Sequence, residues 1–200
     1  MNKAILYIHG KGGSASEAEQ YKPFFPGFDA IGVDYDGYLP CEVREQLKAQ
    51  YDRLCESYGH ISVIANSIGA YFTMLALHDR KVKKALFISP ILDMERLIRD
   101  MMSWAGVTEQ QLREQGEIAT DFGETLSWEY LCFARENPVH WDIPTEILYA
   151  GRDNLTSRQT VERFAKEHNA ALSVMENGEH WFHTNEQLAF LYSWVEGKNM

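Results

Sequence analysis

Short apolar runs recur along the whole chain, and most of them are apolar at consecutive positions rather than at alternating ones. They are Ala4–Ile8, Phe28–Val33, Ile61–Ala65, Ala85–Ile88, Glu146–Tyr149 and Ala171–Met175. Consecutive apolar residues are typical of strands buried on both faces, as in a parallel sheet covered by helices. The intervening stretches, such as 43–58 and 188–195, have helical spacing. The pattern predicts an α/β fold, with a mostly parallel sheet of about six strands flanked by helices and joined by right-handed crossovers.

Three helices are expected to begin at capping boxes, in which a hydroxyl and the side chain three residues later satisfy exposed backbone N–H groups. The candidate pairs are Ser14 with Glu17, Thr156 with Gln159, and Thr184 with Gln187.

The stretch from about 91 to 142 interrupts the alternation, because it has helical patterns and no convincing strand. Insertions of this kind in open α/β sheets sit over the carboxyl ends of the strands, where ligands bind. We therefore predict a single domain over residues 1–200 with a helical lid insertion over about 91–142. Some large apolar residues could line an acyl or aromatic pocket, although residues of this kind more often belong to the core. The candidates are Met101, Met102, Trp104, Trp128 and Trp181.

The segment 61–70 carries the strongest chemical signal. An apolar strand runs into Ser67, which lies between small residues, and an apolar helix follows at once. This is the context of a nucleophile elbow, whose strained turn requires small residues two positions before and after the serine. Gly69 meets that need; Ala65 departs from the usual glycine but is small enough.

Residues 9–14 form a glycine-rich loop between the first strand and a helix. Such a loop directs backbone N–H groups into a cavity, where they stabilise an oxyanion or a phosphate. Phosphate is the weaker option, because the loop matches neither the Walker sequence nor the dinucleotide fingerprint.

Two more polar residues follow strands near the carboxyl end of the chain. Asp153 comes just after the run at 146–149, and His180 lies in the loop after the run at 171–175. In a parallel sheet both loops emerge at the same edge as Ser67. The order Ser, Asp, His is the order expected of α/β-hydrolases.

These four segments together resemble a small serine esterase of the α/β-hydrolase superfamily. They read H-G-K-G-G at 9–13, A-N-S-I-G at 65–69, G-R-D at 151–153 and G-E-H-W at 178–181. The resemblance covers nearly the whole chain. It implies the α/β-hydrolase fold, without the usual N-terminal antiparallel hairpin, and acyl transfer to water.

The chemistry assigns a role to each residue. Ser67 would attack an ester carbonyl, His180 would accept its proton, and Asp153 would orient the imidazole. The backbone N–H of Ile68, with that of Lys11 or Gly12, would form the oxyanion hole. We expect a small-molecule ester substrate and no cofactor. The alternatives are a thioesterase, an amide or peptide hydrolase with the same triad, and a non-catalytic binding protein on a hydrolase scaffold.

Several candidate residues have plainer interpretations. Asp153 could cap a turn, in which case Asp93 is the fallback acid, although Asp93 could itself be a helix N-cap. His180 and His183 are spaced like metal ligands, but no third ligand has suitable spacing, so we predict no metal site. His9 is expected to be a hydrogen-bonded loop residue.

Composition excludes some partners. The formal net charge of −10, from 19 Lys and Arg against 29 Asp and Glu, disfavours nucleic acid and anionic membranes. No apolar run is long enough to span a bilayer. Cys41, Cys55 and Cys132 match neither a disulfide framework nor a zinc motif, so we expect a cytoplasmic protein. Nothing in the sequence predicts the oligomeric state.

Overall fold

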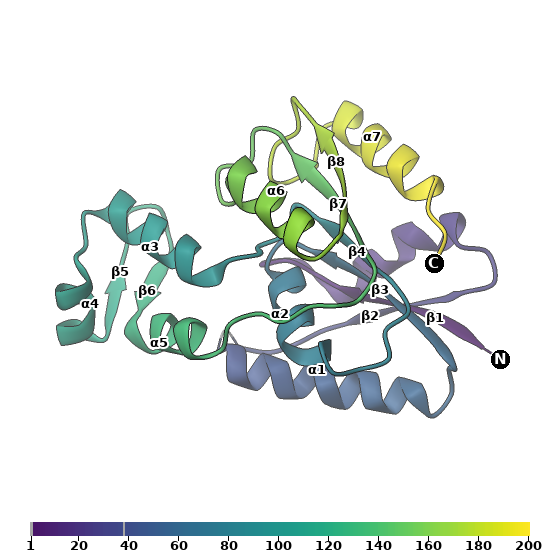
Figure 1. The fold of residues 1–200 in the computed structure, drawn as a ribbon, viewed down its shortest axis with the longest axis horizontal. Helices are drawn as coiled ribbons and strands as arrows, with labels where there is room; N and C mark the ends of the chain where they lie inside the picture. Colours follow the sequence, from purple (N-terminus) through teal and green to yellow (C-terminus); the bar gives the residue numbers. More distant parts are fainter. Residues whose placement is uncertain (1, 38) are drawn as a thin grey trace. The chain divides into compact units, whose positions relative to one another are not determined.

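The computed structural model describes residues 2–37 and 39–200. The chain separates into two compact units (Figure 1). The first consists of Met1–Leu92 and His140–Met200, and the second is Asp93–Val139.

The first unit is built on a parallel sheet that has six strands in the part of the chain described, in the order β2-β1-β3-β4-β7-β8. The strands are β1 (Lys3–Ile8), β2 (Asp29–Val33), β3 (His60–Asn66), β4 (Ala85–Ile88), β7 (Thr145–Ala150) and β8 (Ala171–Met175). Each coincides within one or two residues with a predicted apolar run, so the predicted parallel sheet is confirmed. The chain reverses its direction across the sheet between β1 and β3, which is where open α/β sheets form their binding crevices.

Helices cover both faces of this sheet (Figure 1). They are the 3₁₀ helix η1 (Ala15–Phe24), α1 (Pro40–Cys55), α2 (Ile68–Leu77), α6 (Arg158–Glu167) and α7 (Asn185–Glu196). Helices η1 and α7 share one core cluster, in which Tyr21 and Trp194 pack with Ile5, Ile64 and other strand residues, so both cover the same face of the sheet.

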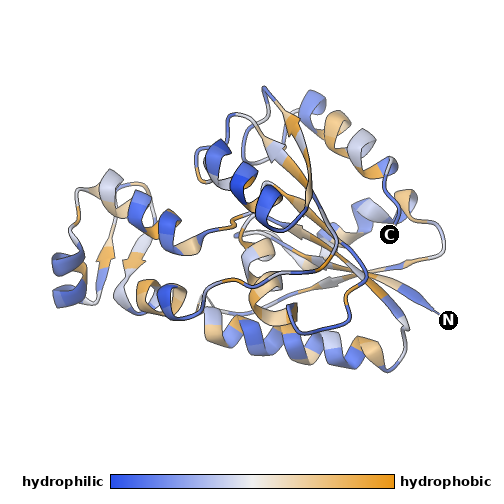
Figure 2. Cartoon of the chain, viewed as in Figure 1, coloured by the Kyte–Doolittle hydropathy of each residue, from blue (hydrophilic) through white to orange (hydrophobic). Residues whose placement is uncertain are grey.

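Helix α2 is the most apolar helix of the first unit, and every residue from Gly69 to Leu77 is buried. Figure 2 shows it apolar on all sides, whereas α1 alternates between polar and apolar faces. A helix that is hydrophobic all round is stable only inside a core. The residue that precedes it, Ser67, is therefore held by a helix that cannot shift without exposing apolar surface.

The capping box predicted at Ser14 and Glu17 is confirmed at η1. At α7 the predicted start is confirmed but the box is not: Thr184 accepts the Gln187 N–H at 3.2 Å, whereas the Gln187 side chain accepts the N–H of His183, at 3.1 Å, rather than that of Thr184. The prediction at Thr156 is wrong by one residue, because Ser157 caps α6.

The second unit contains three helices within the region described: α3 (Met94–Ala105), α4 (Glu109–Gln115) and α5 (Trp128–Glu136). It also contains an antiparallel pair, β5 (Glu117–Ala119) with β6 (Thr125–Ser127). The expectation of helices alone is therefore wrong. Strands of three residues are too short to show an alternating pattern, and only Leu126 among them is buried. The role of the second unit as a lid stays a prediction.

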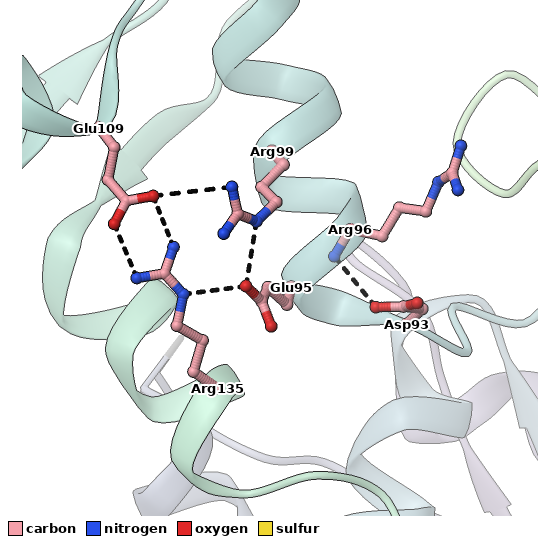
Figure 3. Close-up of polar contacts among 6 residues, drawn as sticks. All are labelled: Asp93, Glu95, Arg96, Arg99, Glu109 and Arg135. Carbon is pink, nitrogen blue, oxygen red and sulfur yellow. Dashed lines mark hydrogen bonds and ion pairs between the residues drawn. The ribbon is translucent and has the colours of Figure 1, made fainter.

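An ion-pair network joins the three helices of the second unit (Figure 3). The Arg135 guanidinium donates to both carboxylate oxygens of Glu109, at 2.8 and 2.7 Å, and to Glu95 at 2.9 Å. Arg99 donates to the same Glu95 oxygen at 3.0 Å. The bond from Arg135 lowers the pKa of Glu95. Bidentate pairing of this kind fixes geometry as well as charge.

None of the helices described, in either unit, combines the length and the apolar character that crossing a membrane requires.

Candidate active site

Ser67 occupies the turn between β3 and α2, with φ 54° and ψ −122°. An L-residue rarely adopts a positive φ, and such a conformation costs about 1–3 kcal/mol. Three backbone hydrogen bonds hold it: the Ser67 N–H donates to Ile88 at 3.0 Å, and its carbonyl accepts from Ala70 at 3.1 Å and from Ile91 at 3.0 Å. The turn therefore has the geometry of a nucleophile elbow, as predicted.

Close backbone contacts explain the small residues around this turn. A methyl group at Gly69 would lie 2.5 Å from the carbonyl oxygens of both Ile8 and His9, so no larger residue fits without displacing the end of β1. Ala65, by contrast, is fully buried in β3. The departure from glycine at position 65 is therefore accommodated.

Three side chains from separate loops meet at the carboxyl edge of the sheet. Ser67 Oγ lies 2.7 Å from His180 Nε2, and His180 Nδ1 lies 2.7 Å from Asp153 Oδ2. The loops that carry them follow β3, β7 and β8. A hydroxyl, an imidazole and a carboxylate joined in this order can move a proton from the hydroxyl oxygen to the ring nitrogen.

The Asp153 side chain is fully buried, and both of its oxygens are satisfied. Oδ1 accepts the backbone N–H groups of Leu155, at 2.7 Å, and Thr156, at 2.9 Å, which leaves Oδ2 for His180. The same carboxylate thus caps its turn and orients the imidazole. Asp93 has a different position, as the N-cap of α3 in the second unit, where it accepts from the Arg96 N–H at 3.0 Å.

Sequence reasoning did not identify the two backbone donors to Asp153. The spacing Asp153 to Thr156 is the available signal, because an Asp side chain often accepts N–H groups two and three residues later. The same contact explains the misplaced helix start: Thr156 lies in this turn, and its hydroxyl donates to Pro90 at 2.9 Å.

The glycine-rich loop passes directly beside the serine. A methyl group at Gly10 would lie 3.1 Å from Ser67 Cβ, so the loop contacts the Ser67 side chain at Gly10 before it continues through Lys11 and Gly12. Ile68 is the first residue of α2, where a backbone N–H has no acceptor within the helix. That the N–H of Ile68, with that of Lys11 or Gly12, forms an oxyanion hole stays a prediction.

His9 is a hydrogen-bonded loop residue, as expected. Its ring is buried, with Nδ1 2.7 Å from the Gly10 carbonyl oxygen, and it stacks on Tyr35 with 4.3 Å between the ring centroids. The Tyr35 hydroxyl donates to the His9 carbonyl at 2.8 Å, which fixes the start of the glycine-rich loop.

The five candidate pocket residues fall in different units. Trp181 belongs to the first unit, is 72% exposed and stacks on His183 with 5.0 Å between centroids. The other four belong to the second unit. There Met102 is buried, Trp104 is exposed with its ring against Phe122, and Met101 and Trp128 are partly buried. A pocket lined by the five residues stays a prediction.

His183 Nε2 lies 3.6 Å from Glu179 Oε2, and its Nδ1 lies 2.7 Å from the carbonyl oxygen of Trp181. Among residues 2–37 and 39–200, no group of three or more His, Cys, Asp or Glu side chains is arranged to hold a metal ion.

No protein-family model matches the sequence, and no curated protein matches it. Solved structures do match. Est1E from Butyrivibrio proteoclasticus, solved with ferulic acid bound, is 17% identical with a TM-score of 0.80, covering 97% of this chain and 86% of that one. The mouse alpha/beta hydrolase domain-containing protein 10 is 15% identical with a TM-score of 0.73, covering 98% and 89%.

An epoxide hydrolase from Bacillus megaterium is 14% identical with a TM-score of 0.65, covering 98% of this chain and 93% of that one. Similarity across nearly the full length, at identities this low, is similarity of fold. The parallel sheet, the elbow at Ser67 and these structural neighbours agree: the chain has the α/β-hydrolase fold.

Proposed function

We propose that the protein is a serine hydrolase that cleaves a carboxylic ester of modest size through an acyl-enzyme intermediate. The observation that carries the proposal is the linkage of Ser67 to His180 at 2.7 Å and of His180 to the buried Asp153 at 2.7 Å. A buried carboxylate that faces an imidazole fixes the ring's orientation and stabilises its cationic form.

The mechanism has two half-reactions, acylation of Ser67 and hydrolysis of the acyl-enzyme. Ser67 Oγ attacks the ester carbonyl while its proton moves to His180 Nε2, and the carbonyl oxygen becomes an oxyanion beside the N–H of Ile68. The intermediate collapses, and the leaving alcohol takes the proton from Nε2. Water then repeats the sequence on the acyl-enzyme, which releases the carboxylic acid and restores Ser67.

The choice of an ester rests on chemistry and on the structural neighbours. Ferulic acid, the ligand of Est1E, is a carboxylic acid, the class of product that ester hydrolysis releases. A thioester or an amide would react through the same groups. The fold also includes an epoxide hydrolase and a thioesterase domain, so the fold alone does not select the substrate.

A fluorophosphonate probe tests the nucleophile. It is expected to label the wild-type protein once and to leave Ser67→Ala unlabelled. Ser57→Ala, at an exposed serine that precedes β3 and so lies at the opposite end of that strand from Ser67, is the matched control and should label as wild type. Absence of labelling in the wild type would support the binding-protein alternative, and labelling that persists in Ser67→Ala would contradict the assignment of Ser67 as the nucleophile.

Asp153→Asn tests the orientation of the imidazole. The asparagine Oδ1 can still accept the N–H groups of Leu155 and Thr156, which turns its NH₂ toward His180 Nδ1 and disfavours the tautomer that accepts the serine proton. The expected result is a fall in kcat of about 10³–10⁴-fold on p-nitrophenyl acetate. Asp93→Asn preserves a helix cap and should leave kcat unchanged; equal effects of the two substitutions would contradict the assignment.

A further inference from the structure

The Glu17 carboxylate lies between the glycine-rich loop and the sheet. Oε1 accepts the backbone N–H of Ser14 at 3.0 Å, and Oε2 accepts the Tyr7 hydroxyl at 2.5 Å. A methyl group at Gly13 would lie 2.6 Å from Oε1, so the carboxylate packs directly against the loop backbone. The Glu17 side chain therefore connects the carboxyl end of this loop, at Ser14, to Tyr7 of strand β1.

The contact with Tyr7 extends to the residue before the nucleophile. Tyr7 is buried in β1, and the side chain of Asn66, which precedes Ser67 in the elbow, interacts with its hydroxyl and lowers its pKa against the larger effect of burial. Burial raises the pKa of Tyr7, so its hydroxyl keeps its proton and continues to donate to Glu17. A continuous chain of contacts thus runs from Ser14 through Glu17 and Tyr7 to Asn66.

Helix capping accounts for only half of this arrangement. A capping glutamate needs only its bond to the N-cap N–H, here that of Ser14. The second bond, to a buried hydroxyl on a neighbouring strand, adds nothing to a cap. The start of η1 also has a separate anchor, because the Ala15 N–H donates to Asp34 at 2.7 Å. The chemistry of Glu17 therefore points to the loop and the elbow rather than to the helix.

We propose that Glu17 is a positioning residue, which sets the distance between the N–H groups of Lys11 and Gly12 and the carbonyl under attack by Ser67. Glu17 touches no reacting atom; it acts through the loop backbone. This inference rests on the proposed function, because oxyanion donors affect the rate only if Ser67 attacks a carbonyl.

Glu17→Ala tests the proposal in steady-state kinetics on p-nitrophenyl acetate. Removal of one oxyanion donor typically lowers kcat about 10²–10³-fold, so a displaced loop is expected to lower kcat about tenfold while KM stays within about twofold. Glu19→Ala is the matched control: it removes the same charge from η1, where Glu19 pairs with Lys22 on the surface, and should leave kcat unchanged. Glu17→Gln should recover kcat to within about threefold of wild type, because its amide oxygen still accepts the Ser14 N–H.

Inhibition by phenylboronic acid provides a readout that loss of stability does not alter. Its serine adduct places an anionic oxygen in the oxyanion hole, so Ki is expected to rise in Glu17→Ala by the same factor as kcat falls. Wild-type kcat and Ki in Glu17→Ala, with only a lower unfolding temperature, would overturn the inference. If Glu17→Ala does not fold, the same measurements are made on Tyr7→Phe, which removes the hydroxyl that donates to Glu17 Oε2.

Ser67→Ala distinguishes failure of this inference from failure of the proposed function. Activity that survives Ser67→Ala contradicts both. Activity that is lost in Ser67→Ala but unchanged in Glu17→Ala and Tyr7→Phe contradicts the positioning role alone.

Discussion

Replacing Ser67 with glycine is expected to give a more stable protein than replacing it with alanine. At φ 54° and ψ −122°, a side chain with a Cβ atom is strained, and glycine is not. Both substitutions remove the hydroxyl that contacts His180, so the lost Ser67–His180 hydrogen bond cancels in the comparison. The difference between the two variants then measures the backbone strain stored at the elbow.

The magnitude follows from two opposing contributions. Relief of the strain stabilises the glycine variant by about 1–3 kcal/mol. The greater freedom of glycine in the unfolded chain offsets this by about 0.5–1 kcal/mol relative to alanine. The free energy of unfolding should therefore be higher for Ser67→Gly than for Ser67→Ala, by up to about 2.5 kcal/mol. For a chain of this size, each kcal/mol shifts Tm by about 2–4 °C.

Urea unfolding followed by circular dichroism measures the difference, provided that the two variants have equal m-values. Ser193, an exposed residue in the last turn of α7, supplies the control pair. There Ser193→Gly should be less stable than Ser193→Ala by about 1 kcal/mol, because glycine weakens a helix. A glycine variant at position 67 that is no more stable than the alanine variant would refute the argument that the turn is strained.

Three further predictions concern packing, charge and specificity. Gly69→Ala places a methyl group 2.5 Å from two backbone carbonyl oxygens and is expected to lower the free energy of unfolding by about 1–3 kcal/mol in urea titrations, whereas a neutral effect would contradict the close approach. Arg135 lowers the pKa of Glu95, so at pH values above the ordinary glutamate pKa their pairing contributes its full stability to the second unit. That contribution is lost as the pH falls through the lowered pKa of Glu95. Hydrogen-exchange protection of residues 93–139 should therefore fall on acidification, and should fall less in Arg135→Met; an equal fall would contradict the role of the ion pair. If the insertion sets specificity, as the sequence predicts, Trp128→Ala should change the preference among p-nitrophenyl esters graded by acyl length more than the rate on the shortest ester, and an unchanged profile would refute it.

The four central strands of the sheet, β1, β3, β4 and β7, were predictable because they are buried on both faces, which leaves a run of consecutive apolar residues in the sequence. The edge strands β2 and β8 are only partly buried, but their sequences are still short apolar runs. The positions of Ser67, Asp153 and His180 were predictable for a related reason. Each follows a strand, and the loops that follow parallel strands emerge at one edge of a sheet. The fold class therefore brings these loops to the same edge before any side-chain contact is known.

Hydrophobic periodicity predicted secondary structure less well in segments whose side chains are mostly exposed. Strands β5 and β6 have three residues each, and most of their side chains are exposed, so no periodic pattern distinguishes them from the helices around them. The capping motif at Thr156 failed because two roles compete for one residue. Its N–H and hydroxyl serve the Asp153 turn and Pro90, and the cap passes to Ser157.

The sequence by itself determined the α/β fold, the strand order along the chain and the three residue types that meet at its edge. Hydrophobic periodicity and turn chemistry are local properties that can be read from the sequence. Once they indicate parallel strands, the loops that follow those strands must emerge at one edge of the sheet. Only the tertiary structure decided which oxygen of Asp153 faces His180, that Gly10 lies against Ser67, and that Glu17 reaches Tyr7. These contacts join residues whose separation in space depends on packing to within about an ångström, which no local pattern encodes.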